Sequence, residues 1–278
     1  MRAGLGGAHA RSVMLFRQLV HRKSSSFTYL LASRPGAEAL FIDPVLDHLE
    51  LYLRLIEALD LRLVFALDTH THTDRRSALP ALLDHTQCVT AMGQESRATV
   101  VASSFRDGEI IDIDGLRLEA WYTPGHTVDS YSFVLEDRVF TGDTLLIRGT
   151  GRTDQGGDPR AQYDSLFGKL LTLPGRTLVY PAHDYNGRHV STIAQERRHN
   201  PRLQLETAEE YANLMHDLHP DDPAHMDRVA RSSLRPSGVL MRELAGLRST
   251  LSPPNAPSPR FSRSELSGSA LGGSPLSR

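Results

Sequence analysis

The 278-residue chain contains little cysteine, little lysine and no long apolar run. Its one cysteine, Cys88, excludes an intramolecular disulfide framework and any zinc site built from paired thiolates. The 31 basic and 33 acidic residues nearly balance, so the chain lacks the basic excess that is typical of a dedicated nucleic-acid-binding protein. No apolar run approaches the ~20 residues of a membrane-spanning helix. We therefore expect neither a nucleic acid nor a membrane as a partner, and the 40% of hydrophobic residues can form the core of a globular domain.

Histidine, by contrast, is abundant, with 13 residues. Imidazole and carboxylate groups suit zinc, iron and manganese, whereas a chain with one thiolate cannot build a cysteine-rich centre. Any metal site in this chain must therefore be sought among its histidines and acidic residues.

The two ends of the chain differ in composition from its middle. The first acidic residue is Glu38, and residues 1–14 are predicted to be a short leader, with a mitochondrial transit peptide as the alternative. Residues 249–278 are rich in serine, proline and glycine, and are predicted to form a disordered tail. Residues 15–248 would then form one domain that ends in helices.

The basic residues are almost all arginine. Lysine occurs only at positions 23 and 169, which leaves 29 of the 31 basic residues as arginine. This bias is typical of a GC-rich bacterial genome, and we expect a bacterial, cytoplasmic protein.

Strands and helices are predicted to alternate along the chain. Apolar runs, many of them alternating, predict strands over residues 15–20, 27–31, 61–67, 88–92, 109–113, 116–122, 131–135, 139–141 and 177–180. One helix is expected to start at Asp43, as an N-cap before Pro44. Further helices are expected around 77–85, 95–102, 160–173, 191–199 and 207–218. This mixture indicates an α/β fold with sheets inside and helices outside.

Four polar clusters follow predicted strands, each where the strand ends. His70 and His72 follow residues 61–67, and the other three clusters contain His126, Asp143 and His183. Because loops at strand ends can meet on one side of a layered sheet, these side chains can converge although they are far apart in sequence. Each cluster alone is weak evidence, but the four in this order predict a metal centre.

The metal-binding residue types, in their order along the chain, resemble those of the metallo-β-lactamase fold superfamily: His70-x-His72-x-Asp74, then His126, Asp143 and His183. The resemblance implies a four-layer αββα sandwich with the metal site at one edge of the two sheets. The segments 148–154 (RGTGRTD) and 180–185 (YPAHDY) resemble, more closely, the persulfide dioxygenase family, whose members are also called sulfur dioxygenases or ETHE1-like proteins. This resemblance covers about residues 15–238.

The family resemblance implies one Fe(II) per chain, held by the catalytic residues His70, His126 and Asp143. Two histidines and one carboxylate form a facial triad that leaves open positions for O₂ and substrate. The implied reaction oxidises glutathione persulfide with O₂ to sulfite and glutathione, as part of sulfide oxidation. The remaining implied site residues stand behind the ligands (His72, Asp74, Arg75 and His183) or contact the substrate (Arg148, Arg152 and Tyr185).

Arg75 is the chief departure from the superfamily pattern, which usually has histidine at this position. Arginine has no lone pair to offer a metal and repels a second cation. The change therefore favours a one-metal oxygenase over the alternative, a glyoxalase-II-like hydrolase of glutathione thioesters that would use zinc and a metal-bound hydroxide. A non-catalytic member of the fold that only binds a ligand is a further alternative. The resemblance is also compatible with a homo-oligomer.

Overall fold

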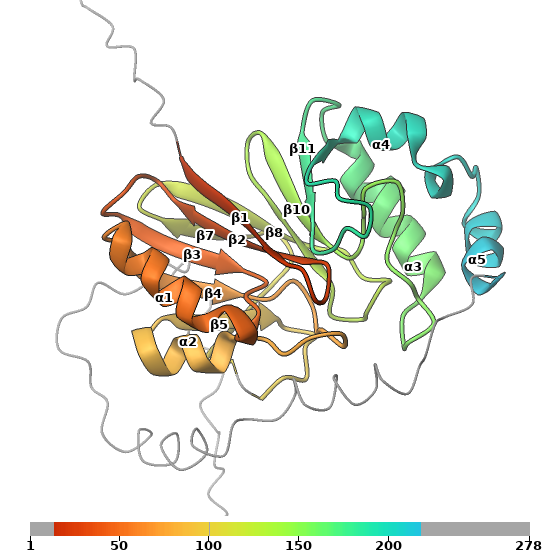
Figure 1. Ribbon diagram of the computed structural model, residues 1–278. Coiled ribbons are helices and arrows are strands. Elements are labelled where there is room, and N and C mark those ends of the chain that lie inside the picture. Colours follow the sequence, from red (N-terminus) through yellow and green to blue (C-terminus); the bar gives the residue numbers. More distant parts are fainter. Residues whose placement is uncertain (1–13, 100, 218–278) are drawn as a thin grey trace, which may run out of the picture.

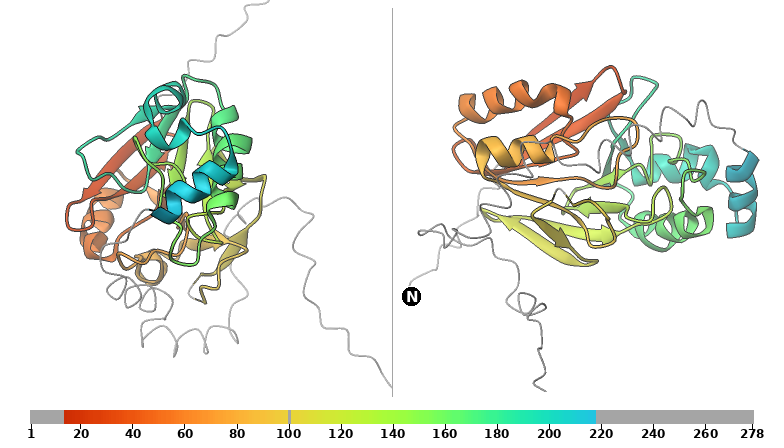
Figure 2. Two further views of the ribbon diagram at one scale, coloured as in Figure 1. Left: turned by 90° about the vertical axis from the view of Figure 1, so that its right-hand side faces the viewer. Right: turned by 90° about the horizontal axis from the view of Figure 1, so that it is seen from below.

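Two six-stranded sheets pack face to face in the computed structural model, which describes residues 14–99 and 101–217 (Figure 1). Helices cover the outer face of the first sheet, and further helices pack against one end of the second, as the view from below also shows (Figure 2). This architecture confirms the α/β four-layer sandwich. The predicted leader lies outside the described residues except for Met14, and so does the predicted tail. Within the described residues, no helix is long and apolar enough to cross a membrane.

The first sheet is antiparallel at its start and parallel from its third strand onward. Its strands, in spatial order, are β1 (Leu15–His21), β2 (Ser26–Ala32), β3 (Glu38–Ile42), β4 (Arg62–Leu67), β5 (Val89–Gly93) and β6 (Ser103–Phe105). A short 3₁₀ turn, η1 (Leu46–His48), leads into helix α1 (Leu49–Ala58), and α2 (Leu79–Thr86) follows β4. Tyr52 and Leu82 of these helices pack with Leu30 and Phe41 of the sheet, which covers the sheet's outer face.

The second sheet is antiparallel apart from one parallel pair, β10 and β11. Its strands are β7 (Glu109–Ile113), β8 (Leu116–Tyr122), β9 (Tyr131–Val134), β10 (Arg138–Gly142), β11 (Leu178–Pro181) and β12 (Ser191–Thr192). The crossover between the parallel strands contains α3 (Pro159–Asp164) and the turns η2 (Ser165–Lys169) and η3 (Leu170–Thr172). The helical segments α4 (Ile193–His199), η4 (Pro201–Leu203) and α5 (Ala208–Asp217) complete this side.

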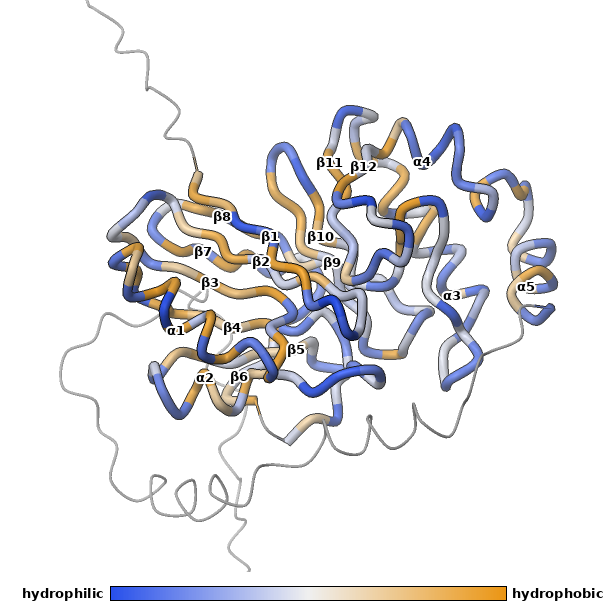
Figure 3. Tube along the Cα trace, viewed as in Figure 1, coloured by the Kyte–Doolittle hydropathy of each residue, from blue (hydrophilic) through white to orange (hydrophobic). Residues whose placement is uncertain are grey.

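Apolar side chains of both sheets meet in a central core, and the strands are the most hydrophobic parts of the chain (Figure 3). Phe140 of β10 lies within this core, with ring centroids 4.7 Å from Tyr29, 5.6 Å from Tyr180 and 6.2 Å from Phe16. Aromatic rings at these separations contribute beyond their buried area. The two sheets are therefore joined by direct side-chain packing close to the end of β10, where the polar loops begin.

Two predicted helix features are wrong. No helix forms over the described residues of this range, 95–99 and 101–102, because Ser96 N donates to Gly93 O in a turn and Ala102 N donates to Thr90 O, which leads the chain into β6. Asp43 is not an N-cap: it has a positive φ of 54° and helical structure starts only at Leu46. Strands β3, β6 and β12 were not predicted, and the helix expected over 191–199 starts only at Ile193, after β12.

We expect Phe140→Ala to destabilise the fold by about 3–5 kcal/mol, the usual cost of removing a buried aromatic side chain. Phe140 is 0% exposed between the sheets, whereas Val20, at 39% exposure, offers a surface control. Urea unfolding of the two variants measures this difference. A loss below about 1 kcal/mol for Phe140→Ala, similar to that for Val20→Ala, would contradict the central position of this ring.

Candidate metal centre

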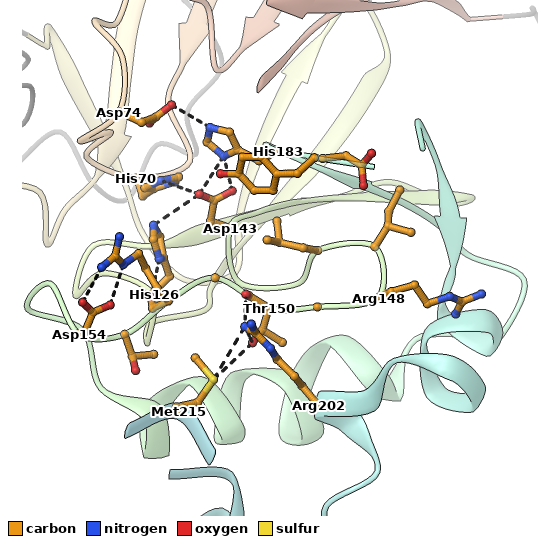
Figure 4. A pocket seen from close by; sticks show the side chains of 18 of the residues that line it. His70, Asp74, His126, Asp143, Arg148, Thr150, Asp154, His183, Arg202 and Met215 are labelled. Atoms are coloured by element: carbon orange, nitrogen blue, oxygen red, sulfur yellow. Dashed lines mark hydrogen bonds and ion pairs between the residues drawn. The ribbon is translucent and has the colours of Figure 1, made fainter. Parts of the chain in front are cut away.

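The four predicted polar loops converge at one edge of the two sheets (Figure 4). His70 follows β4, His126 follows β8, and Asp143 follows β10. His183 lies two residues beyond β11, the parallel neighbour of β10. The carboxyl ends of parallel strands meet at one edge, which explains why residues this far apart in sequence share a site.

His70, His126 and Asp143 place one ligand atom each within 4.8 Å of one another. The Oδ2 atom of Asp143 is 3.8 Å from Nε2 of His70 and 3.5 Å from Nε2 of His126. Atoms at these separations can all bind one divalent metal at bond lengths of about 2.0–2.2 Å. The geometry of these three side chains thus fits a metal centre with two imidazoles and one carboxylate.

Hydrogen bonds on the far side of each imidazole fix which nitrogen faces the site. Nδ1 of His126 donates to the carbonyl oxygen of Arg152 at 2.7 Å. Thr69 Oγ1 donates to the Asp43 carboxylate, so Nδ1 of His70 must donate to Thr69 Oγ1, at 2.9 Å. Both Nε2 atoms therefore carry a lone pair toward the site, as metal ligation requires. Burial, together with the neighbouring His72 and His126, also lowers the pKa of His70 well below its ordinary value, which keeps the ring neutral.

His183 lies between two carboxylates. Its Nδ1 donates to Asp143 Oδ1 at 2.7 Å, and its Nε2 donates to Asp74 Oδ2 at 2.9 Å. Burial opposes protonation, but the two carboxylates outweigh it and raise the pKa of His183 to about 10. The ring is therefore an imidazolium that orients Asp143. Burial alone would raise the pKa of Asp143, but the charge and hydrogen bond of His183 outweigh it and hold this pKa well below its ordinary value.

Arg75 supplies a buried cation next to this site. Its Nη1 donates to the backbone oxygen of Asp43 at 3.1 Å, its Nη2 is 3.2 Å from Nε2 of His72, and its Nε is 3.9 Å from Asp74 Oδ2. Although burial opposes the charge, Asp74, Asp43 and Asp68 raise the pKa of Arg75. A second group of side chains could hold a metal ion: Asp43, Asp68 and His72. Arg75 already places a positive charge in contact with this group. His72 contacts Arg75 and Asp43 and is not part of the group formed by His70, His126 and Asp143.

Asp129, which sequence reasoning missed, ties the two histidine loops together. This carboxylate is 4% exposed and accepts hydrogen bonds from Thr71 N at 3.1 Å and Thr71 Oγ1 at 2.5 Å. Its other oxygen accepts from Thr127 Oγ1 at 2.6 Å. Thr71 follows His70 and Thr127 follows His126, so one buried carboxylate fixes the relative position of two ligand-bearing loops. The sequence signal is slight: an acid two residues after Thr127.

A cavity of about 670 Å³ opens onto the metal-binding side chains. The predicted substrate contacts Arg148, Arg152 and Tyr185 all line it. Tyr185 is 69% exposed, and its ring stacks on His183 with centroids 6.0 Å apart. Arg202 and Met215, which were not predicted to be site residues, line the same cavity.

The sequence and the fold of the chain are similar to those of known proteins. Residues 22–183 match the model of the metallo-beta-lactamase superfamily. The chain is 41% identical over 228 residues to the Homo sapiens protein named "Persulfide dioxygenase ETHE1, mitochondrial", an alignment that covers 80% of this chain and 88% of that protein. The crystal structure of ETHE1 from Myxococcus xanthus is 42% identical, with a TM-score of 0.76, and covers 79% of this chain and 97% of that chain. A metallo-beta-lactamase from Staphylococcus aureus shares the fold at 22% identity and a TM-score of 0.74, over 80% of this chain and 72% of that one.

We expect Asp129→Asn to weaken metal binding about 10- to 100-fold, the usual effect of losing a group that orients metal ligands. The amide keeps the size of the side chain, but its NH₂ group faces the Thr71 or Thr127 donors without accepting from them. Competition with a chromophoric chelator measures the Zn²⁺ affinity, and Asp112→Asn, at an exposed position of β7, is the matched control. Equal affinities for the two variants would contradict the tie between the loops.

We expect the metal-free protein to lose stability as the pH rises from about 6.5 to about 10. A raised pKa means that the folded state holds the His183 proton more tightly than the unfolded chain, with its ordinary value of 6.5, does. The stabilisation is complete below the lower value and is lost as the pH passes the upper one. Urea unfolding across this range should show a smaller fall for His183→Gln than for the parent, whereas His199→Gln, an exposed control, should follow the parent. If the stability of all three proteins fell equally with pH, the His183 ring would not be the charged group.

Proposed function

Because the chain belongs to the metallo-β-lactamase superfamily and, within it, to the persulfide dioxygenase family, we propose that it oxidises glutathione persulfide with O₂. Glutathione persulfide, O₂ and water give glutathione, sulfite and two protons. The observation that carries this proposal is the 41% identity over 228 residues to a named persulfide dioxygenase, together with the grouping of His70, His126 and Asp143.

We propose Fe(II) as the metal, one ion per chain, held by His70, His126 and Asp143. The donor set supports this choice, since two neutral imidazoles and one carboxylate leave positions open for other ligands. When bound, iron would supply redox activity toward O₂ and affinity for the soft persulfide sulfur. Asp143 contributes one negative charge next to the ion, and His183 keeps that carboxylate oriented.

The protein's own side chains shape the approach of the substrate. The cavity of about 670 Å³ is of the size that binds small organic ligands. Arg152 donates two hydrogen bonds to Asp154, from Nε at 2.7 Å and from Nη2 at 2.6 Å, and its carbonyl oxygen orients His126. Arg148 donates from Nη1 to Gln195 O at 2.6 Å and lies 3.5 Å from Glu196. We propose that Arg152 and Tyr185 form the mouth of the site, with Arg148 in its outer wall.

The glyoxalase-II-like alternative is not favoured. The Homo sapiens relative is named a persulfide dioxygenase ETHE1 and the Myxococcus xanthus structure is named ETHE1, and neither name is that of a thioester hydrolase. The buried guanidinium of Arg75, 3.2 Å from His72, adds a physical argument because it opposes a second cation on that side of the site.

We place the reaction in the cytoplasm of a bacterial cell. The arginine-rich, lysine-poor composition supports this assignment, although the Homo sapiens and Bos taurus relatives carry the word mitochondrial in their names.

We expect His126→Ala to lower oxygen uptake on glutathione persulfide by at least about a hundredfold, since losing a direct ligand costs more than losing a supporting partner. The parent should contain close to one iron per chain by elemental analysis, and the variant much less. His85→Ala, on a helix away from the cavity, should match the parent in both measurements. Two metals per chain in the parent, with thioester hydrolysis and no oxygen uptake, would instead establish the hydrolase.

A further inference from the structure

Gln162 is a fully buried polar residue that contacts the loop of one candidate metal ligand. It lies in α3, is 0% exposed, and is not among the residues that line the cavity. Its Nε2 donates to the Gly151 carbonyl oxygen at 3.1 Å, and Gly151 N in turn donates to Asp143 O at 2.7 Å. A buried amide group is costly unless its polar atoms are paired, so the position of this side chain is tied to the loop after β10.

The backbone of residue 162 also packs against the loop that carries His126. A Cβ at Gly125 would lie 2.2 Å from Gln162 Cβ and 2.4 Å from Gln162 N, so only glycine allows α3 to approach this closely. The start of α3 is bonded to the same loop, because Asp158 N donates to Gly125 O at 2.8 Å. The helix thus lies against the His126 loop with its backbone and reaches the Asp143 loop with the Gln162 side chain.

The carbonyl end of the Gln162 amide is bonded to Tyr211 of α5, a helix that lies beside α3 (Figure 1). Tyr211 is also 0% exposed, and its hydroxyl donates to Gln162 Oε1 at 2.8 Å. Burial raises the pKa of Tyr211 to about 12, so the hydroxyl keeps the proton that it donates. Because that proton is given to Gln162, the hydroxyl of Thr150 must donate to the Tyr211 oxygen, at 2.8 Å. Both ends of the amide therefore have partners, and the amide has one fixed orientation.

Stability alone does not account for this buried polar pair. Two apolar side chains of the same shape would pack α3 against α5 about as well, since replacing both partners of a hydrogen bond can be nearly neutral. Hydrogen bonds differ from apolar contacts in being directional, and a fully paired buried network holds one arrangement of its members. The specific effect of Gln162 is therefore on the position of the carbonyl group that it binds, that of Gly151.

We propose that Gln162 is a positioning residue for the metal centre, which fixes the Asp143 loop relative to the His126 loop through the carbonyl group of Gly151. This inference rests on the proposed function, which places a metal ion between these loops. Asp143 Oδ2 lies 3.5 Å from His126 Nε2, and a set of ligands has to be held within about 0.5 Å of its productive geometry. Tyr211 acts one step further away, by orienting the Gln162 amide.

Apolar replacements of matched shape separate positioning from folding. Gln162→Leu removes the acceptor of the Tyr211 hydroxyl and the donor to Gly151 O, and should raise the unfolding equilibrium constant of the metal-free protein about 10- to 100-fold. Adding Tyr211→Phe removes the unpaired hydroxyl, so the double variant should recover part of this loss. Urea unfolding measures both effects. Gln87→Leu, at an exposed position after α2, is the matched control and should follow the parent.

Metal affinity should follow a different order. Gln162→Leu and the double variant both lack the contact with Gly151 O, and both should bind Zn²⁺ about 10- to 100-fold more weakly than the parent. Tyr211→Phe and Gln87→Leu should stay within about threefold of it. Competition with a chromophoric chelator measures the affinity. The absorption spectrum of the Co²⁺-loaded protein reports the ligand geometry and should change in the first two variants only.

The outcomes distinguish this inference from the proposed function. If the double variant regains Zn²⁺ affinity together with stability, Gln162 acts only on folding and the inference is wrong. If Gln162→Leu binds Zn²⁺ as tightly as the parent while persulfide is oxidised, the inference fails and the proposed function stands. If the parent oxidises no persulfide but Zn²⁺ affinity depends on Gln162, the proposed function fails and the positioning role stands. Should Gln162→Leu alone not fold, the double variant tests the same loss of affinity.

Discussion

The buried carboxylate of Asp43 holds together the part of the molecule on which the metal centre depends. It accepts hydrogen bonds from Thr69 N at 2.8 Å and from Thr69 Oγ1, and it lies 3.1 Å from Nε2 of His72. The Thr69 hydroxyl can orient His70 only because its own proton is given to Asp43. One carboxylate thus sets the position of the loop after β4 and, through it, the tautomer of a metal-binding histidine.

The negative charge of the buried Asp43 carboxylate must be compensated by a positive charge nearby, and Arg75 supplies it. Asp43 is 1% exposed and Asp68 is 2% exposed, while the guanidinium of Arg75 is in contact with the backbone of Asp43 and with His72. A buried ion group of this kind tolerates the loss of one member poorly, because an uncompensated charge remains behind. Arg75 therefore compensates the charge of these acids, and its own charge opposes the binding of a second metal ion next to them.

The sequence predicted most of the fold and the side chains that converge at the candidate metal centre, because both depend on local patterns. Apolar runs, many of them alternating, located nine strands of the two sheets, and the polar loops after β4, β8, β10 and β11 could be recognised directly from the residue types at each strand end. Asp129 and Gln162 could not be recognised this way. Their roles depend on partners that the fold brings close, Thr71 for Asp129 and Gly151 for Gln162, at sequence separations that no periodicity encodes. Asp43 was misread for the same reason: its residue type suits a helix cap, but its carboxylate binds Thr69, 26 residues away.

The loop after β10 lines the cavity next to Asp143, and its close packing leaves little room for substitution. Gly151 N donates to Asp143 O at 2.7 Å, and a Cβ at position 151 would lie 2.2 Å from that oxygen and 2.8 Å from Nδ1 of His126. Only glycine allows the loop to pass this close to both ligands. One residue earlier, Thr150 carries the hydrogen bonds of Arg202, and Asn200 Nδ2 donates to Gly149 O at 2.9 Å. Asp143 and Arg202 are therefore each hydrogen-bonded to adjacent residues of this loop, Gly151 and Thr150, so that one short segment of backbone positions both side chains in the wall of the cavity.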